Sequence, residues 1–379
     1  MIITVTMNPA IDKTVYVDKL CEGGLNRVKE AREDAGGKGI NVSKTIRSLG
    51  GNSLATGFLG GMTGWKISSF LDTQHISHEF VQVSQTTRTN LKVVDEDGVV
   101  TEINEPGPEI EESECKALLS LLKKSLKVGD YLVISGSLPK GASASIYEEL
   151  ITLCHEKGAF AFVDADGDNL VRAVQSHPDI IKPNQNELES CIEKMGMSGI
   201  VEEMLSKVKR HELEVKANPG MKAEPEMKAD SEMKADFEMK ADSEMKKWET
   251  LVPVDLHRPL LMGALLVHEG IREVIVSLGK RGAFFISGKK SYYAMPPEVK
   301  ALSTVGAGDA LVGAYALGCE QGEPMENRIR RAIATSAGAV TTQGTSPANL
   351  ETVAKLSAEV TSKMIAFETP VFYNKRDYD

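Results

Sequence analysis

The sequence predicts an α/β fold, a doubly wound and mostly parallel β-sheet with a small antiparallel β lid. Two observations predict the main sheet. Short, nearly continuous apolar runs alternate along the chain with stretches that carry apolar residues at helical spacing, and strands that are apolar on both faces are typical of a buried parallel sheet. Two further stretches of alternating apolar and polar residues lie outside that series and predict the lid.

The expected elements of the main sheet follow one another as strand and helix. The strands are expected at Ile2–Thr6, Ala55–Leu59, Tyr131–Ser135, Ala159–Asp164, Ile180–Lys182 and Glu273–Ser277. The helices are expected at Asn41–Leu49, Ser113–Ser125, Ser145–Glu156 and Asp309–Leu317. A sheet of this kind binds its ligands beyond the carboxyl ends of its strands.

The lid is expected from residues of about 12–35 and 85–105. Thr14–Asp18 and Thr89–Glu102 alternate with a period of two residues. The longer stretch contains Asp95-Glu96-Asp97-Gly98, which is a favourable turn between two antiparallel strands. Strands of this kind, outside the parallel series, can form a small separate sheet.

Composition and charge exclude several classes of partner. The 379 residues carry a formal net charge of −10, and aromatic residues make up only 5%, which disfavours binding to nucleic acid. No apolar run approaches the length of about 20 residues that crosses a bilayer. The chain opens on an expected strand without a basic leader, and its five scattered cysteines show no metal-ligand spacing. We therefore expect a cytoplasmic protein with reduced thiols.

A charged hexapeptide repeat interrupts the pattern at residues 221–247. Methionine recurs every six residues from Met221, a spacing that forms no apolar stripe on a helix. We expect a single domain over residues 1–379, with residues 196–254 as an insertion that is a solvated helix or disordered. The alternative is an arm for docking a partner or for oligomerisation. The flanking residues expected to be buried are Leu251, Val252, Leu260, Leu261 and Leu265.

The segment Ser303–Gly318 carries the first candidate site. Gly306, Ala307 and Gly308 precede the acidic Asp309 and an apolar helix. Small residues allow an anion to approach the backbone, and the first N–H groups of a helix have no partner inside it. Asp309 would repel a resting phosphate, but it suits a base that accepts the proton of an attacking hydroxyl. The alternative is that Asp309 is only an N-cap residue.

A second glycine-rich segment is Ala35-Gly36-Gly37-Lys38-Gly39-Ile40-Asn41. It has neither the P-loop spacing nor the GxGxxG pattern. It combines backbone access, a cation and an amide at a junction between a loop and a helix, which suits a polyol or a sugar phosphate. The alternative is a tight turn with a solvated lysine.

Four further polar segments follow expected strands. They are Asn8–Asp12, Ser135–Lys140, Lys182–Glu187 and Ser277–Gly282. Each alone is typical of a loop. Together they are expected on the edge of the sheet where an α/β fold places its site.

These motifs resemble those of the ribokinase/PfkB family of sugar kinases. The two family signatures are AGGKGIN, with LGG and GFLGG downstream, and STVGAGDALVGA; the family's Asn-x-x-Glu motif corresponds to Asn184–Glu187. The resemblance covers Met1 to about Thr345, apart from the insertion. The segment TEINEPGPEI is most similar to the 1-phosphofructokinase subgroup, and tagatose-6-phosphate kinases share most of the N-terminal pattern.

The resemblance implies roles at the ATP side of the site. Asp309 would activate the acceptor hydroxyl, and the anion-hole amides would come from Gly306, Ala307 and Gly308. Asn184 and Glu187 would organise Mg²⁺ through water. The residues expected to contact ATP are Lys182, Asn184, Ser277, Leu278, Gly279 and Gly282. The chain departs from the family pattern in the insertion, which lies between two of these ATP-side segments.

The resemblance also implies the substrate-binding residues. Sugar hydroxyls would be held by Asp12, Gly37, Lys38 and Asn41. The phosphate already on the sugar would meet Arg88 together with Lys38 or Arg27, because a guanidinium makes a forked contact with phosphate. Asn104 would add a contact from the lid.

The expected activity is the ATP-dependent phosphorylation of fructose 1-phosphate to fructose 1,6-bisphosphate. The alternatives are a tagatose-6-phosphate kinase and a catalytically silent sugar-phosphate sensor on the same fold. The expected partners are a phosphosugar and ATP, with no nucleic acid and no membrane, and a homodimer could form through the lid.

Overall fold

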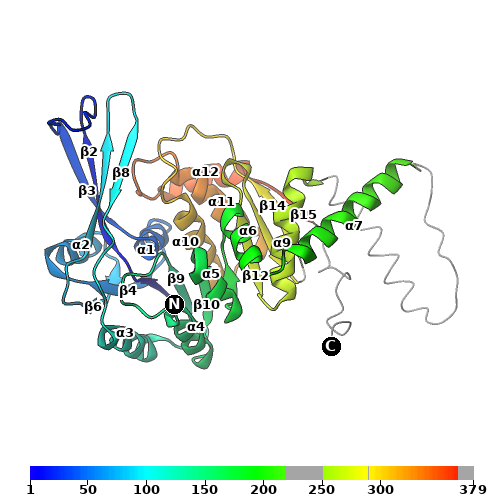
Figure 1. The fold of residues 1–379 in the computed structure, drawn as a ribbon, viewed down its shortest axis with the longest axis horizontal. Helices are drawn as coiled ribbons and strands as arrows, with labels where there is room; N and C mark the ends of the chain where they lie inside the picture. Colours follow the sequence, from blue (N-terminus) through cyan, green and yellow to red (C-terminus); the bar gives the residue numbers. More distant parts are fainter. Residues whose placement is uncertain (218–250, 289, 366–379) are drawn as a thin grey trace. The chain divides into compact units, whose positions relative to one another are not determined.

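The structure is a computed structural model that describes residues 1–217, 251–288 and 290–365 (Figure 1). The described chain divides into two compact units. The first unit comprises Met1–Pro178 and Pro296–Val360, and the second comprises Asp179–Met295 and the strand that begins at Thr361.

A parallel sheet forms the centre of the first unit. Its strands, in spatial order, are β10 (Phe160–Asp164), β9 (Tyr131–Ser135), β1 (Ile2–Thr6), β4 (Ser53–Leu59) and β5 (Ser77–His78). The short β6 (Val81–Gln82) pairs with the end of β4. All five residues of β1 are buried, as expected for a strand that is covered on both faces. The predicted strands of this unit are confirmed to within two residues.

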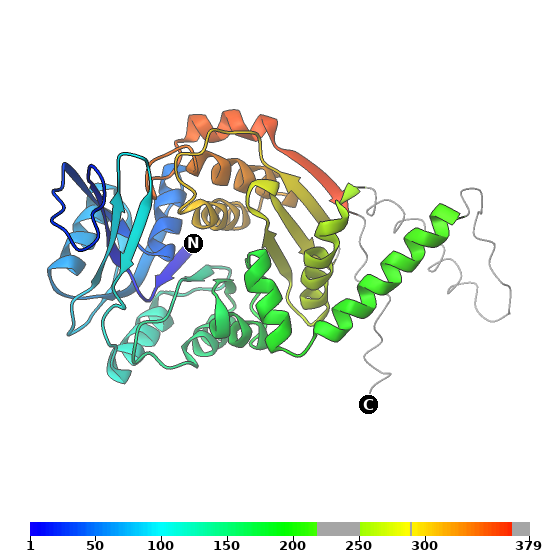
Figure 2. The same cartoon turned by 45° about the horizontal axis from the view of Figure 1, so that its top comes forward.

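Helices lie on both sides of this sheet (Figure 2), most of them against its strands and the last two mainly against other helices. They are α1 (Lys38–Ser48), α2 (Gly61–Thr73), α3 (Glu112–Ser125), α4 (Ile146–Glu156), α5 (Gly167–Gln175), α10 (Ala307–Glu320), α11 (Met325–Ala339) and α12 (Leu350–Glu359). Helices α1 and α10 pack on β1 and on each other. Both begin earlier than predicted, because a glycine, Gly37 or Gly306, occupies the N-cap position.

A separate four-stranded sheet is the predicted lid. Its order is β3 (Glu30–Gly36), β2 (Ala10–Tyr16), β7 (Arg88–Val94) and β8 (Val100–Asn104). The turn between β7 and β8 is the predicted one, with Gly98 N–H donating to the carbonyl of Asp95. Two details differ from the prediction. Strand β2 begins at Ala10 and ends at Tyr16, whereas Thr14–Asp18 was expected. It also pairs with β7 in parallel, because the chain reaches β7 only after crossing the main sheet.

The second unit begins with two parallel strands, β11 (Ile180–Ile181) and β12 (Glu273–Ser277). Three antiparallel strands follow β12, namely β13 (Ala283–Ser287), β14 (Ser291–Met295) and β15 (Thr361–Ile365). These three strands were not predicted. The helices of this unit are α6 (Gln185–Lys194), α7 (Ser198–Ala217) and α9 (His257–His268), with the short turns η1 (Val254–Leu256) and η2 (Gly279–Arg281).

The segment expected as an insertion, residues 196–254, contains the packed helix α7 (Ser198–Ala217). Helix α7 contacts α9, and its Val201, Met204 and Val208 are buried. The repeat at residues 221–247 lies outside the described residues. Of the flanking residues expected to be buried, Val252, Leu260, Leu261 and Leu265 are buried and Leu251 is half-buried. The expectation of a single domain over residues 1–379 stays a prediction.

The five cysteines are free thiols, four of them buried. Among the described helices, none is long and apolar enough to span a membrane.

Candidate active site

The N-terminus of α10 has the geometry of an anion hole. Gly306, the N-cap residue, adopts a left-handed conformation with φ of 82°, which a side chain would strain. The first backbone hydrogen bond of the helix runs from Ala310 N–H to the carbonyl of Gly306, at 2.8 Å. The N–H groups of Ala307 and Gly308 therefore precede the first bond and have no partner within the helix. A phosphate oxygen at this position would also meet the positive end of the helix dipole.

Asp309 lies in the first turn of α10 and is not its N-cap residue. Its side chain is buried, and its Oδ2 accepts a hydrogen bond of 2.8 Å from Nδ2 of Asn41 on α1. The other polar atom of the Asn41 side chain, Oδ1, is buried without a hydrogen-bond partner. The amide nitrogen of Asn41 thus orients Asp309, and its amide oxygen can accept a hydrogen bond from a hydroxyl group.

The glycine-rich turn holds the start of α1 against the carboxyl edge of the main sheet. Gly37 has φ of 114°, and a Cβ atom there would lie 2.6 Å from Cγ2 of Thr6, the last residue of β1. Lys38 follows Gly37 and places its Nζ 3.5 Å from Oδ1 of Asp164, at the end of β10. The Lys38 ammonium thus faces a carboxylate at the sheet edge, while its side chain remains 34% exposed.

A row of four polar residues crosses the lid sheet. The strand registers place Asp12 opposite Asp34 on β3 and opposite Asn90 on β7, and place Asn90 opposite Asn104 on β8. Residues paired in this way share one face of a sheet. Nδ2 of Asn90 donates to Oδ1 of Asp12 at 3.0 Å. The structure therefore brings together two predicted residues, Asp12 and Asn104, and adds two that the sequence analysis did not name.

Arg88 lies at the start of β7 and joins two segments of the first unit. Its Nη2 donates to the carbonyl of Asn8, after β1, and its Nη1 donates to the carbonyl of Glu105, after β8; both distances are 3.0 Å. Its Nε is buried without a hydrogen-bond partner. Burial lowers the pKa of Arg88, and the nearby Asp12 and Glu105 oppose that effect. The guanidinium is thus fixed in position and retains one unused buried donor.

Arg27 does not join this group. It is exposed in the loop between β2 and β3, and no hydrogen bond or ion pair of the described residues connects it to Arg88 or Lys38. The structure offers no geometric support for Arg27 as a phosphate ligand.

The Asn184–Glu187 motif of the second unit forms a capping box at the start of α6. Oε2 of Glu187 accepts from the N–H of Asn184 at 2.8 Å, and Oδ1 of Asn184 accepts from the N–H of Glu187 at 2.9 Å. One oxygen of each side chain is thus used to begin the helix. The described residues contain no cluster of three His, Cys, Asp or Glu that would hold a metal by itself. Mg²⁺ prefers oxygen ligands and usually keeps several water molecules. A site in which two side chains supply oxygen atoms, and water and phosphate fill the remaining coordination positions, therefore fits Mg²⁺.

The predicted ATP-side residues of the second unit are adjacent. Asn184 is bridged to Ser277 at the end of β12, and Ser277 N–H donates to the carbonyl of Pro183 at 3.0 Å. The turn that follows is closed by Leu278 N–H and the carbonyl of Gly282, at 2.8 Å. A Cβ atom at Gly282 would lie 1.9 Å from the carbonyl oxygen of Ala294, so only glycine fits.

Lys182 precedes these residues and is buried. All six residues expected to contact ATP therefore lie in the same region of the second unit.

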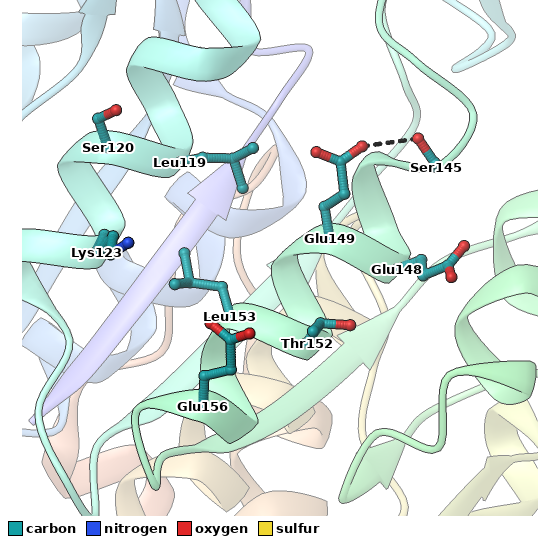
Figure 3. A pocket seen from close by; sticks show the side chains of 9 residues that line it. All are labelled: Leu119, Ser120, Lys123, Ser145, Glu148, Glu149, Thr152, Leu153 and Glu156. Carbon is teal, nitrogen blue, oxygen red and sulfur yellow. Dashed lines mark hydrogen bonds between the residues drawn. The ribbon is translucent and has the colours of Figure 1, made fainter.

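A cavity of about 450 Å³ lies between α3 and α4 (Figure 3). It is lined by Leu119, Ser120, Lys123, Ser145, Glu148, Glu149, Thr152, Leu153 and Glu156. None of the predicted site residues lines it. Three glutamates against one lysine make it unsuitable for a phosphosugar or for ATP, since both are anions.

Comparison with known proteins identifies the class of protein that this fold and these residues define. A family model described as "pfkB family carbohydrate kinase" matches residues 5–215 and 260–352. The chain belongs to the pfkB family of carbohydrate kinases, and it is an ATP-dependent sugar kinase. The match through residue 215 places most of α7 within the family pattern.

Two curated proteins that are similar to this chain are named for different sugar substrates. The chain is 31% identical over 333 residues to the 1-phosphofructokinase of Bacillus subtilis, and the alignment covers 88% of this chain and 90% of that protein. It is 30% identical over 336 residues to the tagatose-6-phosphate kinase of Staphylococcus epidermidis, with the same coverage.

Solved structures confirm the fold. The crystal structure of a putative phosphofructokinase from Staphylococcus aureus has a TM-score of 0.71 at 28% identity, and covers 96% of this chain and 99% of that one. The ribokinase of Thermotoga maritima has a TM-score of 0.65 at 19% identity, over 94% and 99% of the two chains. The predicted ribokinase-like fold is therefore correct.

Proposed function

We propose that this sugar kinase phosphorylates fructose 1-phosphate to fructose 1,6-bisphosphate with ATP. The observation that carries the proposal is the buried Asp309 carboxylate beside the first N–H groups of α10, oriented by Asn41. The relative with 31% identity, a 1-phosphofructokinase, supports the choice of sugar.

The acceptor hydroxyl would lie next to Asp309. The Asp309 carboxylate, whose Oδ2 accepts from Asn41, would take the proton as the hydroxyl attacks. General-base catalysis of this kind contributes about 10²–10⁴-fold. The N–H groups of Ala307 and Gly308 would stabilise the charge on the phosphoryl group during transfer.

The lid face would hold the sugar. Asp12 and Asn90 form a hydrogen-bonded pair in the row that also includes Asn104. A carboxylate accepts from sugar hydroxyls, and amides both donate and accept. Oδ1 of Asn41, which has no partner in the protein, would accept from another hydroxyl.

The phosphate already on the sugar would be bound by Arg88 and Lys38. Arg88 is anchored through both Nη atoms and retains its buried Nε as a donor. The ammonium of Lys38 lies at the carboxyl edge of the main sheet. Arg27, the other residue expected at this phosphate, is exposed.

The second unit would bind ATP through Lys182 and the turn Ser277–Gly282. Asn184 and Glu187 would hold Mg²⁺ through water, with the oxygen atoms that the capping box does not use. When bound, Mg²⁺ neutralises charge on the phosphate oxygens of ATP.

A second candidate is the phosphorylation of tagatose 6-phosphate. The relative with that name is 30% identical over the same share of the chain, so overall similarity does not separate the two substrates. A silent sugar-phosphate sensor is disfavoured, because a sensor has no use for a base that a neighbouring amide orients.

We also propose a cytoplasmic protein that forms a homodimer through the lid. Strand β8 is an edge of the lid sheet, and its Val100 and Ile103 are exposed. An edge strand with exposed apolar side chains favours pairing with another chain. Size-exclusion chromatography of Ile103→Lys should give a smaller particle than the parent protein.

The experiment that tests the activity is a coupled ADP-release assay with four acceptors, namely fructose 1-phosphate, fructose 6-phosphate, tagatose 6-phosphate and ribose. The proposal predicts the highest kcat/KM for fructose 1-phosphate. A higher kcat/KM for tagatose 6-phosphate would establish the second candidate, and no ADP release with any acceptor would favour the sensor.

A further inference from the structure

A buried lysine on α1 has no part in the mechanism above. Lys44 is only 5% exposed. Its Nζ donates to the carbonyl of Ala35 at 3.0 Å and contacts Oγ1 of Thr345 at 3.4 Å. A buried ammonium is costly unless hydrogen bonds and opposite charges compensate it. These contacts tie α1 to the end of β3 and to the loop that follows α11.

The residues around the Lys44 ammonium are mostly acidic. Asp12, Asp34 and Asp309 favour the charged form of Lys44, whereas Arg32 disfavours it. Burial is the largest influence and lowers the pKa of Lys44. The ammonium therefore lies among carboxylates from the lid sheet and from the start of α10, including the proposed base.

The loop at residues 344–346 connects Lys44 to the anion hole. A Cβ atom at Gly306 would lie 3.6 Å from Cα, Cβ and Cγ2 of Thr345, so Thr345 lies next to the N-cap of α10. The same loop is held from β3, where Nη2 of Arg32 donates to Oγ of Ser346 at 2.8 Å.

We propose that Lys44 is a positioning residue for phosphoryl transfer, whose ammonium fixes Thr345 behind Gly306 and so fixes the N–H groups at the start of α10. The proposal rests on the proposed function, because it assigns those N–H groups to the transferred phosphoryl group. Lys44 acts through Thr345 and Gly306 and does not itself contact the substrate.

The kinetic test is Lys44→Met, which keeps the length of the side chain and removes its charge. We expect kcat to fall about 10- to 100-fold, since a displacement of about 1 Å in the groups that position the substrate can cost about 100-fold. The KM for the sugar phosphate should change by less than about threefold, because the substrate contacts are elsewhere. The matched control is Lys116→Met, an exposed lysine of α3, which should leave kcat unchanged.

A second variant keeps the test valid where Lys44→Met fails to fold. Thr345→Val removes the hydroxyl that Lys44 contacts and preserves the shape of the side chain, whereas Thr345→Ser preserves the hydroxyl. We expect the valine variant to lose kcat and the serine variant to retain more of it. Equal kcat for the two variants would contradict the role of the hydroxyl contact.

The pH profile tests the role of the charge. The pKa of Lys44 is lowered, so Lys44 loses its proton at a lower pH than an ordinary lysine. The kcat of the parent protein should therefore fall at an alkaline pH that lies below the usual pKa of lysine. In Lys44→Arg the guanidinium stays charged, so this fall should be absent. The same alkaline fall in both proteins would contradict the proposal.

A readout that does not depend on activity is amide hydrogen exchange in the intact protein. Lys44→Met should exchange faster than the parent in peptides over residues 303–312 and 341–348, and at the parent's rate over β12. If the parent protein phosphorylates no sugar, the proposed function fails, and the exchange measurement still tests the Lys44 contact. Parental exchange at residues 303–312 together with parental kcat would overturn the inference.

Discussion

Replacing Asp309 with asparagine removes the proposed base and nearly preserves its size. Oδ2 of Asp309 accepts from Asn41 at 2.8 Å, and the carbonyl oxygen of an asparagine at this position can accept the same bond. The variant therefore keeps the connection between α10 and α1. Loss of a general base lowers kcat by about 10²–10⁴-fold, which corresponds to about 3–5 kcal/mol in the transition state.

The assay measures kcat by coupled ADP release, and it measures binding of ATP and of fructose 1-phosphate separately by calorimetry. We expect kcat of Asp309→Asn to fall by about 10²–10⁴-fold, with both dissociation constants within about threefold of the parent values. A kcat within a few-fold of the parent would refute the assignment of Asp309 as the base.

A double-mutant cycle with Asn41→Ala tests how the base is oriented. A hydrogen bond to a charged group is worth about 1.5–3 kcal/mol, so Asn41→Ala alone should lower kcat by about 10- to 150-fold. If Asn41 affects kcat by orienting Asp309, the same change should cost much less in the Asp309→Asn background. Equal costs in both backgrounds would contradict that coupling.

Three further predictions concern other parts of the chain. Arg88→Ala should raise the KM for the sugar phosphate by about tenfold or more. A rise confined to the KM for ATP would contradict the assignment of Arg88 to the phosphate of the sugar. Gly37→Ala adds a Cβ atom 2.6 Å from Thr6 Cγ2 at φ of 114° and should destabilise the fold by about 1–3 kcal/mol; unchanged thermal melting would contradict the strain argument. Deletion of Met221–Lys247 should leave melting and kcat nearly unchanged, since loop-closure entropy varies by only about 0.6 kcal/mol per doubling of length, and a fall of more than about 8 °C in Tm would contradict it.

The main sheet could be predicted because its strands are buried on both faces. In β1 every residue is buried, so the apolar run and the strand have the same bounds. Strand β3 lies largely within the range expected for the lid, but its bounds were not predicted, because Glu30–Gly36 is mostly charged and forms a strand through its pairing with β2. The aromatic strands β13 and β14, by contrast, carry a signal that the sequence does contain: apolar runs on either side of a short polar turn.

The candidate site was predictable where a local motif defines it. The glycine-rich turns directly precede α1 and α10, and these two helices bring Asn41 to Asp309. Asn90 and Lys44 carried no local signal, because their roles depend on strand register and on a loop about 300 residues away in the sequence.

The roles of Asn184–Glu187 and of Arg27 could not be established from the sequence. The Asn184–Glu187 pair has a sufficient structural reason as a capping box, so its role toward Mg²⁺ stays a prediction. Arg27 was assigned by resemblance alone, and it is exposed in the loop between β2 and β3.

The most direct test of the central claim is a competition for ATP between equal concentrations of fructose 1-phosphate and tagatose 6-phosphate, with the products followed by ³¹P NMR. The proposed function predicts that fructose 1,6-bisphosphate forms first and in excess, and that Asp309→Asn forms neither product at a comparable rate. Preferential formation of tagatose 1,6-bisphosphate would contradict the proposed substrate, and rapid product formation by Asp309→Asn would contradict the proposed mechanism.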